Sequence, residues 1–88
     1  MELNIKLNKD LKNALIGMWA GARTVNLHYK DMTEQERQKL DDTMKEVFDI
    51  LDSNKVSFKA QNAIMWHGIN NIDCNFTDTL RALKIELI

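Results

Sequence analysis

The chain has 88 residues, of which 44% are hydrophobic and 28% are charged, and its net charge is −1. This length fits a single domain, and the composition is typical of a globular protein rather than a disordered one. The near-neutral charge argues against nucleic-acid binding by bulk electrostatics. One cysteine, Cys74, excludes an intrachain disulfide, and no stretch of eighteen apolar residues occurs. Because the first thirty residues also lack the pattern of a secretory leader, we expect a cytoplasmic protein that does not enter a membrane.

The first seven residues alternate between apolar and polar side chains, with Leu3, Ile5 and Leu7 on one side. This period of two predicts a half-buried strand. A helix is then predicted from Lys9 to about Tyr29, with Asn8 as its N-cap. Its apolar stripe consists of Leu11, Leu15, Met18, Ala22, Val25 and Tyr29.

Gly17 and Gly21 stand one helical turn apart in this helix, so they share a face. A face of small residues allows either another helix or a flat ligand to approach the backbone. Close packing within the chain is the simpler interpretation. Trp19 is predicted at the margin of the apolar stripe or on the surface, and an exposed tryptophan there would be a candidate binding contact.

Residues 32–51 form the most readable helix of the sequence. Thr33 and Glu36 have the spacing of a capping box, which fixes the start of a helix. The apolar stripe consists of Leu40, Met44, Val47, Phe48 and Leu51. We expect the rest of the chain to be organised around this stripe and to cover it, and we expect Asn54 to take a left-handed conformation at the end of the helix.

Charge is unevenly distributed along the chain. Residues 31–52 carry eight acidic and three basic side chains, whereas the segments on both sides are mildly basic. Neutralisation within the molecule is the simpler interpretation. The alternative is a charged docking surface formed by Asp41, Asp42 and Asp49.

A third helix is predicted from Phe58 to about His67, with Ser57 as its N-cap. Apolar side chains occupy most of its circumference, so we expect it to be the most buried element or to be covered on one side by a second chain. Gly68 is expected to end or kink this helix. Trp66 is a second candidate contact.

The last residues fit either a helix or a strand. We predict a short helix over Thr77–Ala82, capped by Thr77, and then a strand over Leu83–Leu87, because the strand at Leu3–Leu7 needs a partner for its backbone groups. The fold prediction is therefore a mainly α, small three-helix domain with short N- and C-terminal strands available to pair. An all-α fold is the alternative.

Catalytic and metal-binding patterns are sparse. His28 and His67 are far apart in the sequence and lack the spacing of zinc ligands. Cys74 has no adjacent lysine or arginine to activate its thiol in a cysteine–histidine pair. No glycine-rich phosphate loop is present. We therefore expect a protein that is not an enzyme and that needs neither a metal nor a cofactor.

The functional prediction is a protein-interaction module. Two tryptophans, five methionines and a helix that is apolar on most sides exceed what so small a core absorbs, so we expect a homodimer or larger assembly. Size and the absence of proline suit a stoichiometric binder, such as an inhibitor or adaptor of phage or mobile-element type. Its candidate contacts are Trp19, Trp66 and the acidic face of Asp41, Asp42 and Asp49.

Two alternatives remain open from the sequence. The first is a nucleic-acid-binding transcriptional regulator that uses Lys55, Lys59 and Gln61 on the third helix. The second is a nucleotide or other small-ligand binder at a subunit interface, with the ligand against Gly17 and Gly21 and stacked on Trp19.

Overall fold

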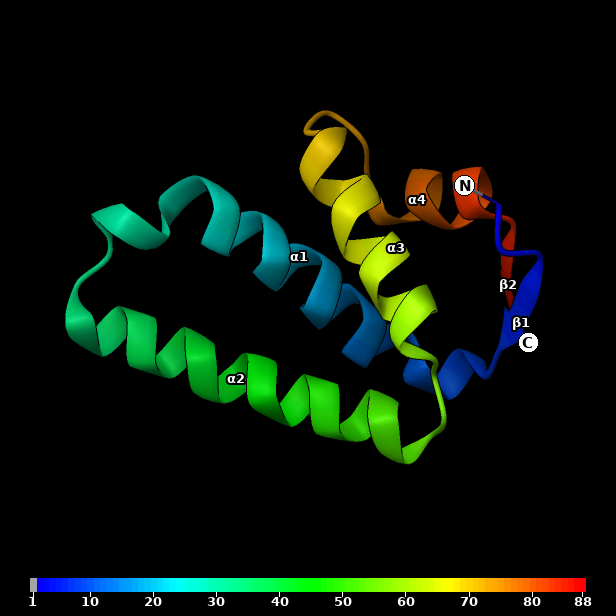
Figure 1. The fold of residues 1–88 in the computed structure, drawn as a ribbon, viewed down its shortest axis with the longest axis horizontal. Helices are drawn as coiled ribbons and strands as arrows, with labels where there is room; N and C mark the ends of the chain where they lie inside the picture. Colours follow the sequence, from blue (N-terminus) through cyan, green and yellow to red (C-terminus); the bar gives the residue numbers. More distant parts are fainter. Residues whose placement is uncertain (1) are drawn as a thin grey trace.

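The computed structural model describes residues 2–88, and within them the chain is mainly helical with a small sheet formed by its two ends (Figure 1). The helices are α1 (Lys12–His28), α2 (Glu34–Ser53), α3 (Phe58–Asn70) and α4 (Phe76–Leu83). The strands are β1 (Ile5–Leu7) and β2 (Ile85–Leu87), and 3₁₀ turns at Lys9–Leu11 and Tyr29–Asp31 flank α1. The predicted mainly α fold with terminal strands is confirmed.

Helix α1 is the centre of the molecule. Helix α2 runs antiparallel along one side of α1, and α3 packs across another side, so each contacts α1 more than it contacts the other (Figure 1). Leu15 and Met18 of α1 are fully buried, together with Leu51 of α2 and Ile64 of α3. The expectation that residues 32–51 organise the chain is therefore wrong. Because only one helix lies along most of α2, the first half of its stripe stays partly exposed.

The two predicted N-caps at Thr33 and Ser57 are confirmed. The Thr33 hydroxyl accepts a hydrogen bond from the Glu36 N–H at 3.2 Å, and the Glu36 carboxylate accepts one from the Thr33 N–H at 2.9 Å. The Ser57 hydroxyl accepts from the Ala60 N–H at 3.1 Å. Each bond satisfies a donor that the first turn of a helix would otherwise leave without a partner.

The end of α2 differs by one residue from the prediction. Lys55, with φ of 61°, takes the left-handed conformation that was expected at Asn54. The Lys55 N–H donates to the Asp52 carbonyl at 3.0 Å, and the Val56 N–H donates to the Leu51 carbonyl at 3.0 Å. This is the Schellman pattern, in which the left-handed residue lies one position beyond the cap. It turns the chain so that Val56 is buried beneath the start of α3.

Gly68 does not end α3, which continues to Asn70. The glycine instead permits close packing, since a Cβ atom at this position would lie 2.5 Å from the indole Nε1 of Trp19. The predicted cap at Thr77 is also wrong. Asn75 caps α4, and its side chain accepts from the Asp78 N–H at 2.9 Å while the Asp78 carboxylate accepts from the Asn75 N–H at 3.0 Å.

The two strands pair in parallel, with Ile5 opposite Ile85 and Leu7 opposite Leu87. Each is shorter than predicted, and Leu83, expected in a strand, is the last residue of α4. Lys84 adopts the left-handed conformation with φ of 56°, which turns the chain from α4 into β2. None of the helices within residues 2–88 combines the length and apolar character needed to cross a bilayer.

Candidate functional site

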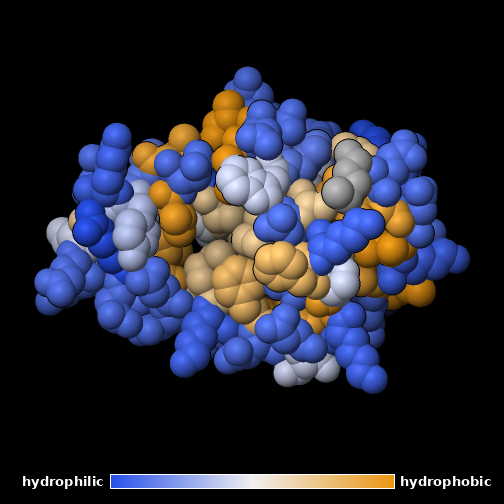
Figure 2. All heavy atoms as spheres, viewed as in Figure 1, coloured by the Kyte–Doolittle hydropathy of each residue, from blue (hydrophilic) through white to orange (hydrophobic). Residues whose placement is uncertain are grey.

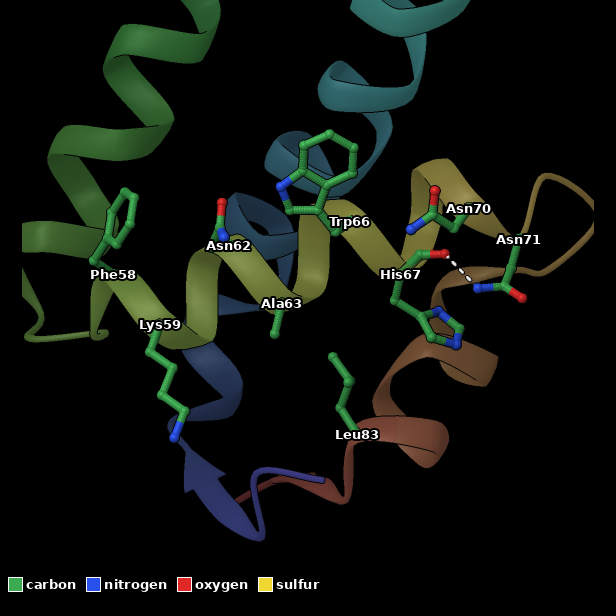
Figure 3. A pocket seen from close by; sticks show the side chains of 9 residues that line it. All are labelled: Phe58, Lys59, Asn62, Ala63, Trp66, His67, Asn70, Asn71 and Leu83. Atoms are coloured by element: carbon green, nitrogen blue, oxygen red, sulfur yellow. Dashed lines mark hydrogen bonds between the residues drawn. The ribbon is translucent and has the colours of Figure 1, made fainter. Parts of the chain in front are cut away.

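A groove of about 550 Å³ runs along the outer side of α3 (Figure 3). Its lining comes from α3, from the residue that follows it and from the end of α4: Phe58, Lys59, Asn62, Ala63, Trp66, His67, Asn70, Asn71 and Leu83. Seen from outside, Phe58 and Trp66 extend to one side of α3, whereas Lys59 and His67 extend to the other (Figure 3). Its volume lies within the range of sites that bind ligands or peptide side chains.

Two large aromatic side chains on the rim are exposed. Phe58 is 78% exposed and Trp66 is 52% exposed. Figure 2 shows apolar atoms gathered near the centre of this face within a hydrophilic rim. The side of α3 that carries these two residues is therefore not covered in the chain alone. Helix α1 covers only the side of α3 that carries Ala60, Ile64 and Gly68.

A chain of buried hydrogen bonds fixes one wall of the groove. The indole N–H of Trp19 donates to the Thr79 hydroxyl at 2.9 Å, and His67 Nδ1 lies 2.8 Å from the same hydroxyl oxygen. Thr79 is fully buried. His67 is therefore a partly buried, hydrogen-bonded histidine. Because Nδ1 is engaged, Nε2 is the ring nitrogen left for a ligand in the groove.

Trp19 itself belongs to the core. It is 8% exposed, its ring meets Phe76 edge to face with centroids 5.9 Å apart, and the Arg23 guanidinium lies 4.4 Å from its centroid. The indole is therefore packed on both sides and presents no open stacking surface. Its role is to hold Thr79, and through Thr79 the ring of His67.

Cys74 lies close to this hydrogen-bonded chain, although its sequence context argued against a cysteine–histidine pair. Its sulfur is 3.9 Å from His67 Nδ1 and 3.6 Å from the Thr79 hydroxyl oxygen. The Nδ1 atom is nearer to Thr79, so the nitrogen that faces the thiol already has a hydrogen-bond partner. Arg23 donates to the backbone carbonyls of Ile72 and Cys74 and not to the sulfur. Within residues 2–88, no group of three or more His, Cys, Asp or Glu side chains is placed to hold a metal ion.

The structure brings two of the predicted contact residues, Lys59 and Trp66, to the same groove. Lys55 lies in the turn before α3 and does not line it. Gly17 and Gly21 face α2: a Cβ atom at Gly17 would lie 3.2 Å from a Val47 methyl carbon, and one at Gly21 would overlap the sulfur of Met44. Helix α2 thus occupies the small-residue face, as the simpler interpretation held.

The remaining predicted contacts lie elsewhere. Asp41, Asp42 and Asp49 are exposed on α2, away from the groove lining. The Tyr29 hydroxyl donates to the Asp41 carboxylate at 2.9 Å, and this hydrogen bond raises the pKa of Tyr29. Gln61, proposed as a nucleic-acid contact, is only 4% exposed. Its amide donates to the Asp52 carboxylate at 2.8 Å and to the Val56 carbonyl at 3.0 Å, so it has no free face for a base.

The sequence did not identify the amide and apolar lining of the groove. Phe58, Asn62, Trp66 and Asn70 recur every four residues, and this spacing marks a helix face. The sequence does not single out this face, because apolar side chains occupy most sides of the helix and the pattern does not show which side the other helices cover. Comparison with protein-family models, with curated proteins and with solved structures finds no match to this chain.

Proposed function

We propose that the chain is a non-enzymatic protein-interaction module that binds a partner protein through the α3 groove. The observation that carries this proposal is the exposure of Phe58 and Trp66 on the rim of that groove. Large aromatic side chains contribute much of the binding energy at protein interfaces when a partner buries them. An exposed apolar face within a polar rim is also the arrangement that interfaces favour.

The mode of action we propose is occupancy. A small chain that covers part of a partner's surface acts as a stoichiometric inhibitor or an adaptor, and we place such a role in the cytoplasm and in a phage or mobile-element setting. Self-association is the second form of the proposal, in which a second copy covers the same aromatic face.

The test compares two double variants in a pull-down from host-cell lysate treated with nuclease. Phe58→Ala with Trp66→Ala removes the aromatic rim. Leu27→Ala with Ile50→Ala removes two exposed apolar side chains elsewhere, since these are 44% and 47% exposed. We expect the wild type and the control to recover the same protein in stoichiometric amount and the groove variant to lose it. Far-ultraviolet circular dichroism checks that all three chains are folded.

Three results would contradict this function. In the first, the groove variant still recovers the partner protein. In the second, the control variant loses the partner as completely as the groove variant does. In the third, the wild type recovers no protein once the lysate has been treated with nuclease. Light scattering tests the self-associating form: twice the chain mass for the wild type, together with a monomer for the groove variant, would favour this form over a different partner protein.

A further inference from the structure

The groove has a charge character different from that of the whole molecule. The chain contains thirteen acidic residues, yet none of the described residues that line the groove carries a carboxylate. Lys59 supplies a positive charge at one end, and Asn62, Asn70 and Asn71 contribute side-chain amides. The lining therefore favours a ligand that is negatively charged and rich in hydrogen-bonding groups.

His67 supplies a second donor at the other end. The Thr79 hydroxyl accepts the indole N–H of Trp19, so its own hydrogen is available for His67 Nδ1. When the Thr79 hydroxyl donates to Nδ1, a neutral imidazole carries its proton on Nε2, and a charged imidazolium also carries a proton there. We assign Nε2 as a hydrogen-bond donor on this basis. The groove thus has a donor near each end, Lys59 and His67.

The separation of these donors selects a ligand spacing. Lys59 and His67 are eight residues apart on α3, which corresponds to about 12 Å along a helix axis. An extended peptide rises about 3.3 Å per residue, so it covers this distance in about four residues. Between the two donors, Ala63 and Leu83 point toward each other and form an apolar floor (Figure 3).

We infer that the α3 groove binds an extended acidic segment of a partner protein, with two carboxylates about four residues apart and a large apolar side chain between them. This inference rests on the proposed function and names the chemistry of its partner. The carboxylates pair with Lys59 and His67, and the apolar side chain packs on Ala63 and Leu83 beside Trp66, which lines the same groove. Amide side chains, which both donate and accept, pair with the backbone of the extended segment.

The same observations disfavour two other occupants. A second copy placed face to face would set this carboxylate-free surface against itself and leave Lys59 without an opposite charge. A nucleic-acid strand needs a groove with several cationic contacts along its phosphates. This lining has one lysine, so the aromatic rim alone would have to hold such a strand.

The test measures the fluorescence of Trp66 while blocked peptides are added, because Trp19 is buried and Trp66 is exposed. The acidic peptide has the sequence Ala-Asp-Ala-Phe-Ala-Asp-Ala, and two matched peptides carry Asn or Lys in place of both Asp residues. We expect the acidic peptide to bind at least tenfold more tightly than the Asn peptide, and the Lys peptide not to bind. Trp66→Phe checks that the signal comes from Trp66.

Two lysine variants test the placement of the charge. Lys59→Gln should weaken the binding of the acidic peptide at least tenfold. Lys45→Gln, at an exposed position of α2, should leave the affinity for this peptide unchanged. Lys59→Glu should bind a peptide with one Asp replaced by Lys more tightly than the wild type does. Equal loss in both glutamine variants would show general charge attraction and would overturn the assignment.

Other outcomes separate this inference from the proposed function. Equal binding of the Asp and Asn peptides would overturn the acidic partner but leave a protein-binding groove. A dimer that requires Phe58 and Trp66 would show that a second copy is the occupant. Binding of a ten-residue oligothymidylate without peptide binding would overturn both. Absence of peptide binding, together with a partner retained by the groove variant, would also overturn both.

Discussion

The Thr79 hydroxyl fixes the positions of two neighbouring side chains. It is fully buried, and it holds Trp19 on one side and His67 on the other. One oxygen can serve both neighbours because a hydroxyl has two lone pairs that accept and one hydrogen that it donates. Among the described residues, no buried side-chain nitrogen or oxygen lacks a partner. The hydroxyl thus links the core to the groove wall.

Replacement of this hydroxyl is expected to destabilise the fold. In Thr79→Val the indole N–H of Trp19 remains buried without an acceptor, which costs about 2 kcal/mol in the free energy of unfolding. Urea unfolding measures this loss. Thr79→Ser keeps the hydroxyl and should retain most of the stability, and Thr77→Val, at an exposed position of the same helix, should stay within about 0.5 kcal/mol of the wild type. A Thr79→Val chain as stable as the wild type would refute this role.

No sequence signal joined these residues, because Trp19 and Thr79 are sixty positions apart. Only the crossing of α1 with the other helices brings them together. Cys74 and His67 are only seven positions apart, and their proximity depends instead on the turn between α3 and α4.

At the scale of elements, local signals were the reliable ones. The capping box at Thr33 and Glu36 and the cap at Ser57 involve side chains within three residues, so the sequence alone predicts them. The prediction of an N-cap failed where several polar residues compete for the position, as with Asn75 and Thr77 at the start of α4. The exposed side of α3 was not predictable, because it depends on which side α1 covers.

The capping box gives a pH-dependent contribution to stability. Hydrogen bonds from the Thr33 backbone and side chain lower the pKa of Glu36. The contribution is therefore fully present above the ordinary glutamate pKa and is lost as pH falls through the lowered value of the folded state. We expect Glu36→Gln to be less stable than the wild type at pH 7, and we expect this difference to shrink by pH 3. Urea unfolding at both pH values measures it.

A second pair of chains is the control for this effect. In a Thr33→Ala background the hydrogen bond of the threonine hydroxyl is absent, so the pH dependence of the Glu36→Gln difference should become weaker. A difference that stays constant from pH 7 to pH 3 in the original background would argue against the capping box as its source.

At the scale of the whole molecule, burial is concentrated at one end of α2. The molecule measures 38 × 28 × 18 Å, and α2 lies along α1 at its edge (Figure 1). No residue from 34 to 46 is buried, whereas Val47 and Leu51 in the second half of α2 are. Few buried apolar contacts make local opening easy.

We therefore expect unequal hydrogen exchange along the chain. Backbone amides in residues 38–44 of α2 should exchange at least tenfold faster than those in residues 15–22 of α1, because opening the first region disrupts little of the core. Hydrogen exchange with mass spectrometry measures both regions in one sample. Equal protection of the two regions would show that α1 and α2 open only together.

The strand pairing gives the fold a mechanical property. Because β1 and β2 are parallel, the residue where the first begins and the residue where the second ends lie at opposite ends of the sheet. Further backbone bonds, from the Leu3 N–H to the Leu83 carbonyl at 2.7 Å and from the Lys9 N–H to the Ile88 carbonyl at 2.8 Å, extend the contact in both directions. Tension along the backbone would slide the strands past each other and load these bonds together. The helices between β1 and β2 would carry no force until these backbone hydrogen bonds break.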